Sequence, residues 1–230
     1  MCGRFTLFSS PRELQQFFGT PPPSFEFSPN YNVAPTQDIP VIIQHKGGRH
    51  LEKLHWGLVP FWAKDASIGS RMINARVETV ASKPAFRAAI KQRRCLIPAN
   101  GFYEWSGKTG NKQPYYFCLP TDEPLAFAGL WEVWENKNVP SDAEPYKSCT
   151  IITTDASESV KDIHNRMPLI LKPEVYAEWL YPENKEPGRI EEILKNGFVK
   201  ELKRYPVSNW VNQVRNNSKE CMEQLKNAGP

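Results

Sequence analysis

The 230-residue sequence lacks several features that would define common classes of protein. No stretch approaches the roughly 18 consecutive apolar residues that a membrane helix needs, so we expect no membrane partner. The first 20 residues carry Arg4, Arg12 and Glu13 without a continuous apolar core, so we expect no secretory signal. These absences predict a protein of the cytoplasm or the nucleoid, and we expect a monomer.

Metal-binding and phosphate-binding patterns are also missing. The five cysteines are scattered and form no CxxC pair, which argues against a zinc site and against a disulfide framework. The four histidines form no HxH or HxxxH pair, and no glycine-rich phosphate loop is present. We therefore expect no metal and no cofactor. The net charge of +4 permits binding to a polyanion but does not decide the matter.

The local patterns that are present predict a mainly antiparallel α+β fold. Ser10, Pro11, Glu13 and Gly19 mark the two ends of a short helix. Residues 39–57 read as a β-hairpin that turns at Gly47–Gly48, and residues 82–92 read as helical. Further strand-like runs interrupt the helices without a βαβ rhythm, and the length suits one domain spanning residues 1–230. Cys95, Cys118 and Cys149 lie in apolar runs and are expected in the core.

Three stretches hold polar residues that packing alone would not require: "MINARVET", "ANGFYEW" and "IHNRMPLI". Strand alternation places Glu104 on the same face as Phe102. If that face is buried, the carboxylate needs a partner or has a raised pKa, as a general acid or base would; otherwise Glu104 faces solvent. Seen alone, His164 is expected to be a helix-end residue hydrogen-bonded to backbone.

The second residue of the chain is a cysteine. The initiator methionine is generally removed when the next side chain is small, which would leave Cys2 with a free α-amine beside its thiol. On its own, a cysteine at this position is usually no more than a small residue that begins a strand.

Six ordered blocks together resemble the SRAP family of SOS-response-associated peptidases, which act as abasic-site processing proteins. They are "MCGRF", "WGLVPFW", "NARVET", "RRCLIPANGFYEW", "DIHNRMPLIL" and "VNQVRNN". The resemblance implies a single β-rich domain with short flanking helices and a basic cleft for single-stranded DNA that contains abasic sites. It implies Cys2 as the nucleophile, surrounded by Asn74, Glu104 and His164. It also implies that Arg4, Arg76 and Arg166 hold DNA phosphates, and that Trp56 and Trp62 lie in a loop that packs against or wedges the strand.

This chemistry explains why an amine and a thiol would be needed on one residue. With reference pKa values near 8 and 10.4, roughly a quarter of an α-amine but only about 0.1% of a lysine is neutral at pH 7.4. A neutral amine condenses with the aldehyde of an abasic site, and the adjacent thiol can then close a five-membered thiazolidine ring. In this scheme Asn74 orients the amine, Glu104 moves protons and His164 stabilises the opened sugar oxygen.

Two alternatives of other classes stay open. The chain could be an N-terminal-nucleophile or thiol peptidase, in which Cys2 attacks an amide and Glu104 or His164 acts as the base. It could also be a DNA-binding module that performs no chemistry and uses only its arginines and aromatic residues.

Overall fold

We analysed a computed structural model of the chain, which describes residues 2–108, 110–135, 145–181, 183 and 187–225. The elements, in chain order, are β1 (Phe5–Leu7), α1 (Pro11–Phe18), β2 (Asn30–Val33), β3 (Asp38–His45), β4 (Gly48–Trp56), η1 (Ala66–Arg71), β5 (Asn74–Arg76), α2 (Ala89–Gln92), β6 (Arg94–Ala99), β7 (Gly101–Ser106), β8 (Gln113–Cys118), β9 (Leu125–Trp134), β10 (Tyr146–Asp155), β11 (Arg166–Pro168), β12 (Ile170–Leu171), η2 (Pro173–Val175), α3 (Tyr176–Leu180), α4 (Pro187–Asn196), β13 (Lys203–Pro206), η3 (Asn209–Asn212) and η4 (Lys219–Met222). The predicted α+β class, rich in antiparallel strands, is confirmed.

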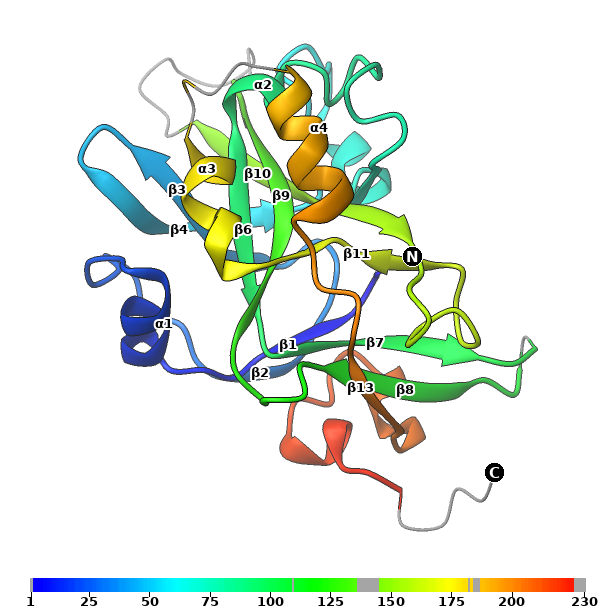
Figure 1. Ribbon diagram of the computed structural model, residues 1–230. Coiled ribbons are helices and arrows are strands. Elements are labelled where there is room, and N and C mark those ends of the chain that lie inside the picture. Colours follow the sequence, from blue (N-terminus) through cyan, green and yellow to red (C-terminus); the bar gives the residue numbers. More distant parts are fainter. Residues whose placement is uncertain (1, 109, 136–144, 182, 184–186, 226–230) are drawn as a thin grey trace.

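Two sheets form the framework (Figure 1). An eight-stranded sheet has the order β11-β10-β4-β3-β6-β9-β12, with β5 added beside β10. Because β9 also pairs with β10, the strands β10, β4, β3, β6 and β9 close on themselves as a barrel. A five-stranded sheet with the order β13-β8-β7-β1-β2 lies beside this barrel. Strand β10 pairs in parallel with β4 and β5, whereas the other pairings between strands are antiparallel.

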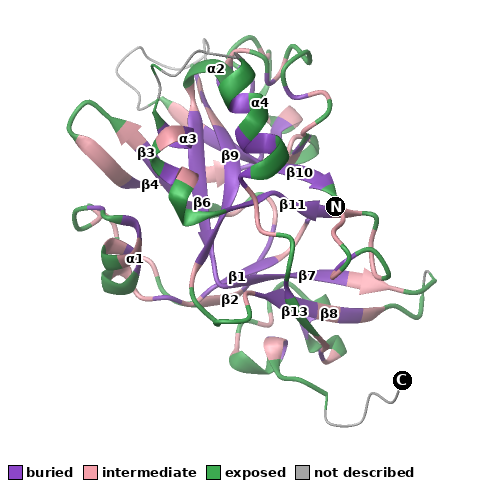
Figure 2. Cartoon of the chain, viewed as in Figure 1, coloured by how far each residue is buried: buried purple, intermediate pink, exposed green. Residues whose placement is uncertain are grey.

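The main hydrophobic core fills the barrel and reaches the five-stranded sheet, as the buried colouring of β6, β9 and β1 indicates (Figure 2). Phe5 of β1 packs against Trp56 and Phe127, with ring centroids 5.2 and 5.6 Å away. A smaller cluster, which includes Tyr103, Tyr116 and Val211, covers the other face of the five-stranded sheet. The core therefore fixes β1, and with it the residues that precede Phe5.

Local sequence signals explain several elements. Ser10 accepts a hydrogen bond from Glu13 N–H while Glu13 accepts one from Ser10 N–H, and Gly19 ends α1 with φ +65°, as predicted. The predicted hairpin is β3–β4. The helix predicted for residues 82–92 is wrong for most of its length. Only Ala89–Gln92 form a helix, and turns occupy the residues before Ala89. Cys95, Cys118 and Cys149 are buried, as expected. No helix in the described ranges is long and apolar enough to cross a membrane.

Candidate functional site

Strand pairing brings the N-terminal segment against Glu104. Phe5 lies opposite Phe102, and Tyr103 N–H donates to Arg4 O over 3.0 Å, so the residues just before Arg4 continue along the edge of β7. Cys2 is fully buried there. Burial and the negative charge of Glu104 raise the pKa of the Cys2 thiol far above its usual range. The thiol is therefore protonated at neutral pH.

Glu104 faces the interior, like its neighbour Phe102 on the same face of β7. Only 4% of the residue is exposed. Burial raises the pKa of the Glu104 carboxyl, while nearby positive charge, that of Lys112 included, partly opposes that increase. Of the two readings left open by the sequence, the buried one is found. A carboxyl with a raised pKa can exchange protons closer to neutral pH than an ordinary surface glutamate can.

Asn74 reaches Cys2 from the opposite side of the site. It begins β5, which pairs in parallel with the buried strand β10. Its Nδ2 donates to the backbone carbonyl of Cys2 over 2.8 Å. Its Oδ1 is buried and has no hydrogen-bond partner among the described residues. A buried acceptor without a donor is costly, so this oxygen is suited to receive an N–H group close to Cys2.

His164 precedes β11 and lines the same pocket as Glu104. The backbone N–H of Arg166 donates to His164 Nδ1 over 2.9 Å. His164 Nδ1 also lies 3.1 Å from the backbone carbonyl of Arg166, to which it can donate in the other tautomer. These two backbone contacts, both made by Nδ1, hold the direction of the imidazole.

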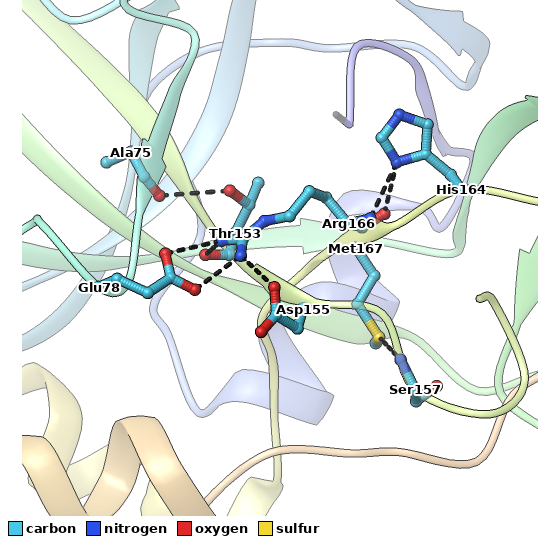
Figure 3. Close-up of polar contacts among 8 residues, drawn as sticks. All are labelled: Ala75, Glu78, Thr153, Asp155, Ser157, His164, Arg166 and Met167. Atoms are coloured by element: carbon cyan, nitrogen blue, oxygen red, sulfur yellow. Dashed lines mark hydrogen bonds and ion pairs between the residues drawn. The ribbon is translucent and has the colours of Figure 1, made fainter.

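The Arg166 side chain points away from His164 and binds carboxylates (Figure 3). Its Nη1 donates to Glu78 and to Asp155, both over 2.6 Å, and its Nη2 donates to Glu78 and to the Thr153 carbonyl. Only 11% of the side chain is exposed. A DNA phosphate that binds this guanidinium would have to replace or share these carboxylate contacts.

The other two arginines have different surroundings. Arg4 is half-buried, and its Nη1 donates to Asn32 Oδ1 over 2.7 Å and to Val211 O over 2.8 Å. Its guanidinium lies 5.8 Å from the centre of the Trp105 ring, and burial lowers its pKa. Arg76, on β5, is exposed. Of the three arginines, Arg76 is the one whose side chain is open to solvent.

The two tryptophans assigned to a DNA-contacting loop differ in exposure. The prediction that Trp56 lies in a DNA-contacting loop is wrong. Trp56 is the last residue of β4, is fully buried, and donates from Nε1 to Ile73 O over 2.9 Å. Its ring packs in the core and offers no surface on which a base could stack. Trp62 follows in the next loop and is 48% exposed, beside the 59% exposed Phe61.

A pocket of about 600 Å³ has Glu104, His164 and Arg4 among its described lining residues, but not Cys2 or Asn74. At one end it is lined by Glu104 and His164, and it continues past Arg4 and Trp105 to Asn209 and Asn212 of η3. Lys112, in the turn between β7 and β8, also lines it. The sequence reasoning assigned no role to Trp105, Lys112, Asn209 or Asn212. The block "VNQVRNN" begins at Val211 and could have drawn attention to Asn212, but not to Asn209.

Comparisons with known proteins place this site in a family. Residues 1–214 match the family described as SOS response associated peptidase (SRAP). YoqW of Bacillus subtilis (strain 168), an abasic site processing protein, is 45% identical, and the alignment covers 97% of this chain and 99% of YoqW. HMCES of Gallus gallus, also an abasic site processing protein, is 33% identical over 85% of this chain and 66% of HMCES. A crystal structure of a Bacteroides thetaiotaomicron protein superposes with a TM-score of 0.85 at 25% identity, covering 97% of this chain and 100% of that one. The chain therefore belongs to the SRAP family.

Proposed function

We propose that this protein processes abasic sites in single-stranded DNA by capturing them covalently through Cys2, once Met1 has been removed. The observation that carries the proposal is the arrangement around Cys2. Its backbone carbonyl is bound by Asn74, its thiol lies within the field of the buried Glu104, and the Oδ1 atom of Asn74 is left without a donor among the described residues. The names of the relatives YoqW and HMCES support the same reading.

The reaction begins with the open-chain aldehyde of the abasic sugar. The neutral α-amine of Cys2 attacks the carbonyl carbon and forms a carbinolamine, which loses water to give an imine. The thiol then adds to the imine carbon: sulfur bonds to carbon, and the thiol proton ends on nitrogen. The product is a thiazolidine, and the whole sequence releases one water molecule. Since both nucleophiles belong to one residue, the second addition is intramolecular and benefits from enforced proximity.

Each neighbouring group has a role that its surroundings support. Asn74 Oδ1 would accept an N–H bond from the new α-amine and aim its lone pair at the aldehyde. Glu104 would transfer protons during ring opening and dehydration, since its raised pKa suits both giving and taking a proton near neutrality. His164, which lines the same pocket as Glu104, would donate to the sugar oxygen that is freed when the ring opens.

The state of the Cys2 thiol argues against the peptidase alternative. A cysteine peptidase needs a thiolate, and catalytic cysteines reach it through a lowered pKa. Here burial and Glu104 raise the pKa of the thiol instead. Addition to an imine is less demanding, because the imine is a stronger electrophile than an amide and Glu104 can accept the thiol proton as the bond forms.

The test is incubation with a single-stranded oligonucleotide that contains one abasic site, followed by a denaturing gel and intact mass spectrometry. We expect a covalent band whose mass equals protein without Met1 plus DNA minus one water. Gel retardation without a covalent band would favour a DNA-binding module. Cleavage of peptide substrates without a covalent DNA band would favour the peptidase.

A further inference from the structure

A second cavity, of about 800 Å³, follows the outer edge of strand β4. None of the described residues that line it also lines the pocket that holds Glu104 and His164. The β3–β4 hairpin projects at the left of Figure 1, whereas β11, which follows His164, lies at the right. This edge is therefore separate from the site that the proposed chemistry uses.

The outer edge of β4 carries backbone groups without a partner strand. Strand β10 pairs with β4 at only two positions, at the end of β4, and otherwise follows β9. The Trp56 N–H donates to Gln37 O, on the side of β3, whereas the Gly57 N–H donates to the side of β10. Backbone groups alternate in direction along a strand, so those of Leu51 and Lys53 point away from β3. No described residue is hydrogen-bonded to them there.

One face of β4 gives this edge an apolar wall. Arg49, Leu51 and Lys53 share that face, and Arg49 Nη1 donates to Phe18 O at the end of α1 over 3.1 Å. The proline-rich loop that follows α1 therefore lies on the same face, and its Phe25 lines the cavity together with Leu51. An added strand would meet an apolar surface beside Leu51 and a cation beside Lys53.

The charge that the cavity leaves uncompensated is positive. Among its described lining residues the carboxylates are Asp38 and Glu52. Glu52 pairs with Lys147 over 2.5 Å, and Asp38 lies 3.4 Å from His55. Lys53 is exposed and has no ion-pair partner in the described part of the chain. A ligand that carries a carboxylate next to Lys53 would supply the missing partner.

We propose that the outer edge of β4 binds an extended acidic peptide of a partner protein, which adds to the sheet as a strand antiparallel to β4. Antiparallel pairing is slightly more stable than parallel pairing, and edge addition is a common mode of peptide recognition. The peptide would place an acidic residue opposite Lys53 and, two positions later, an apolar residue opposite Leu51. The same edge of a second copy would bring two basic edges together, and a nucleic-acid backbone has no donor for the free carbonyls.

The test uses a fluorescent peptide, acetyl-Thr-Thr-Glu-Thr-Phe-Thr-Thr-amide, titrated with the full chain and followed by anisotropy. We expect a Kd of about 10–100 µM, as for a small transient interface. In the proposed register the Glu and Phe amides face β4, and the amide of the Thr between them faces away. N-methylation of the Phe amide should weaken binding at least about tenfold, whereas N-methylation of that Thr amide should leave it within about twofold.

A charge exchange tests the contact with Lys53. Lys53→Glu should weaken binding about three- to tenfold, and a peptide with Lys in place of Glu should prefer the variant to the wild type. Lys46→Glu is the matched control, since it makes the same change at the exposed turn of the same hairpin, outside the cavity. Lys46→Glu should stay within about twofold of wild type. Equal effects of the two variants would overturn the assigned contact.

Hydrogen exchange followed by NMR tests the backbone pairing directly. The Leu51 and Lys53 amides should exchange readily in the free protein and become protected when the peptide binds. Absence of peptide binding, binding without this protection, or equal losses from the two N-methylated peptides would overturn strand addition.

A DNA competitor separates this inference from the proposed function. A single strand that carries a tetrahydrofuran abasic analogue, which cannot form the adduct, should leave the peptide bound. Displacement of the peptide with a shift of the Leu51 and Lys53 amides would assign the edge to nucleic acid and overturn the peptide. Crosslinking to a reactive abasic strand should be the same with and without peptide and in Lys53→Glu. The peptide site and the capture of abasic sites can therefore fail independently.

Discussion

Replacing Glu104 with glutamine tests whether the buried carboxyl moves protons. The side chain keeps its shape and stays buried, but it can no longer give or take a proton. Positioned general acid–base groups contribute about 10²–10⁴ to rate, so we expect adduct formation to slow by about a hundredfold or more, which corresponds to roughly 2.7 kcal/mol. Binding to the unreactive tetrahydrofuran strand should be unchanged.

The assay is single-turnover crosslinking between pH 4.5 and 8, followed on denaturing gels. A proton acceptor works only when ionised, so the wild-type rate should fall as pH drops through the pKa of Glu104. Because burial raises that pKa, the decline should begin at a higher pH than the ordinary glutamate value of about 4.3 would give. Protonation of the α-amine slows both proteins as pH falls, so the part due to Glu104 is the ratio of the wild-type rate to the Glu104→Gln rate, and this ratio should fall as pH drops through the raised pKa of Glu104. With a preformed open-chain aldehyde, which needs no ring opening, Glu104→Gln should slow adduct formation by a smaller factor.

The pH dependence of folding stability is an independent test of the Glu104→Gln variant. A carboxyl whose pKa is raised by folding contributes stability below its unfolded pKa and loses it as pH rises through the folded pKa. Glu104→Gln should therefore gain stability relative to wild type as pH rises toward 7, measured as the urea midpoint.

Glu132 is the matched control. Like Glu104, it is a glutamate with 4% of its surface exposed, but it pairs with Arg93 over 2.8 Å outside the pocket. Glu132→Gln should lose stability and keep the crosslinking rate. Wild-type rates in Glu104→Gln would refute the catalytic role and leave the residue structural.

Three further predictions concern the terminus and the arginines. An uncleavable tag ahead of Cys2 turns the amine into an amide, so the protein should bind abasic strands without a stable adduct; crosslinking equal to the native protein would exclude the thiazolidine route. Arg76→Ala, measured by anisotropy across a salt series, should flatten the log–log dependence by about 0.7 if Arg76 holds one phosphate. Glu78→Gln should tighten DNA binding up to about fivefold by releasing Arg166, a limit set by the modest strength of partly exposed ion pairs. That gain should vanish in an Arg166→Ala background.

Local signals in the sequence were sufficient where neighbours along the chain determine the structure. The capping box of α1 joins Ser10 and Glu13, and the β3–β4 hairpin pairs two consecutive strands around one tight turn. For Glu104, alternation predicted only that it shares a face with Phe102; whether that face is buried was left open, and the structure shows that it is. These features depend on periodicity and turn chemistry, which a single sequence displays directly.

Long-range pairing determined what the sequence could not predict. Trp56 looked like a loop residue, but its indole N–H is bound by the Ile73 carbonyl and its ring meets Phe5, contacts that arise only when the barrel closes. Arg166 and Glu78 are 88 positions apart, so no spacing rule could show that a candidate phosphate ligand is held by carboxylates. Asn209 of η3 is likewise linked, through Asn212, to Trp105 of β7, which is distant in the sequence.

The buried Glu104 beside Cys2 would have opposite effects in a peptidase and in aldehyde capture. A negative charge held near Cys2 opposes thiolate formation, which would be a defect in a peptidase. In aldehyde capture the same charge is useful, because it stabilises the positively charged iminium that precedes ring closure and then accepts the proton that sulfur releases. The amine attacks first and the thiol second, so the thiol does not have to be ionised in the resting protein. Keeping it protonated and buried also protects it from oxidation, since oxidation of cysteine proceeds from an accessible thiolate. The site thus suits the proposed capture, in which the thiol adds to an electrophile that the terminal amine has already activated.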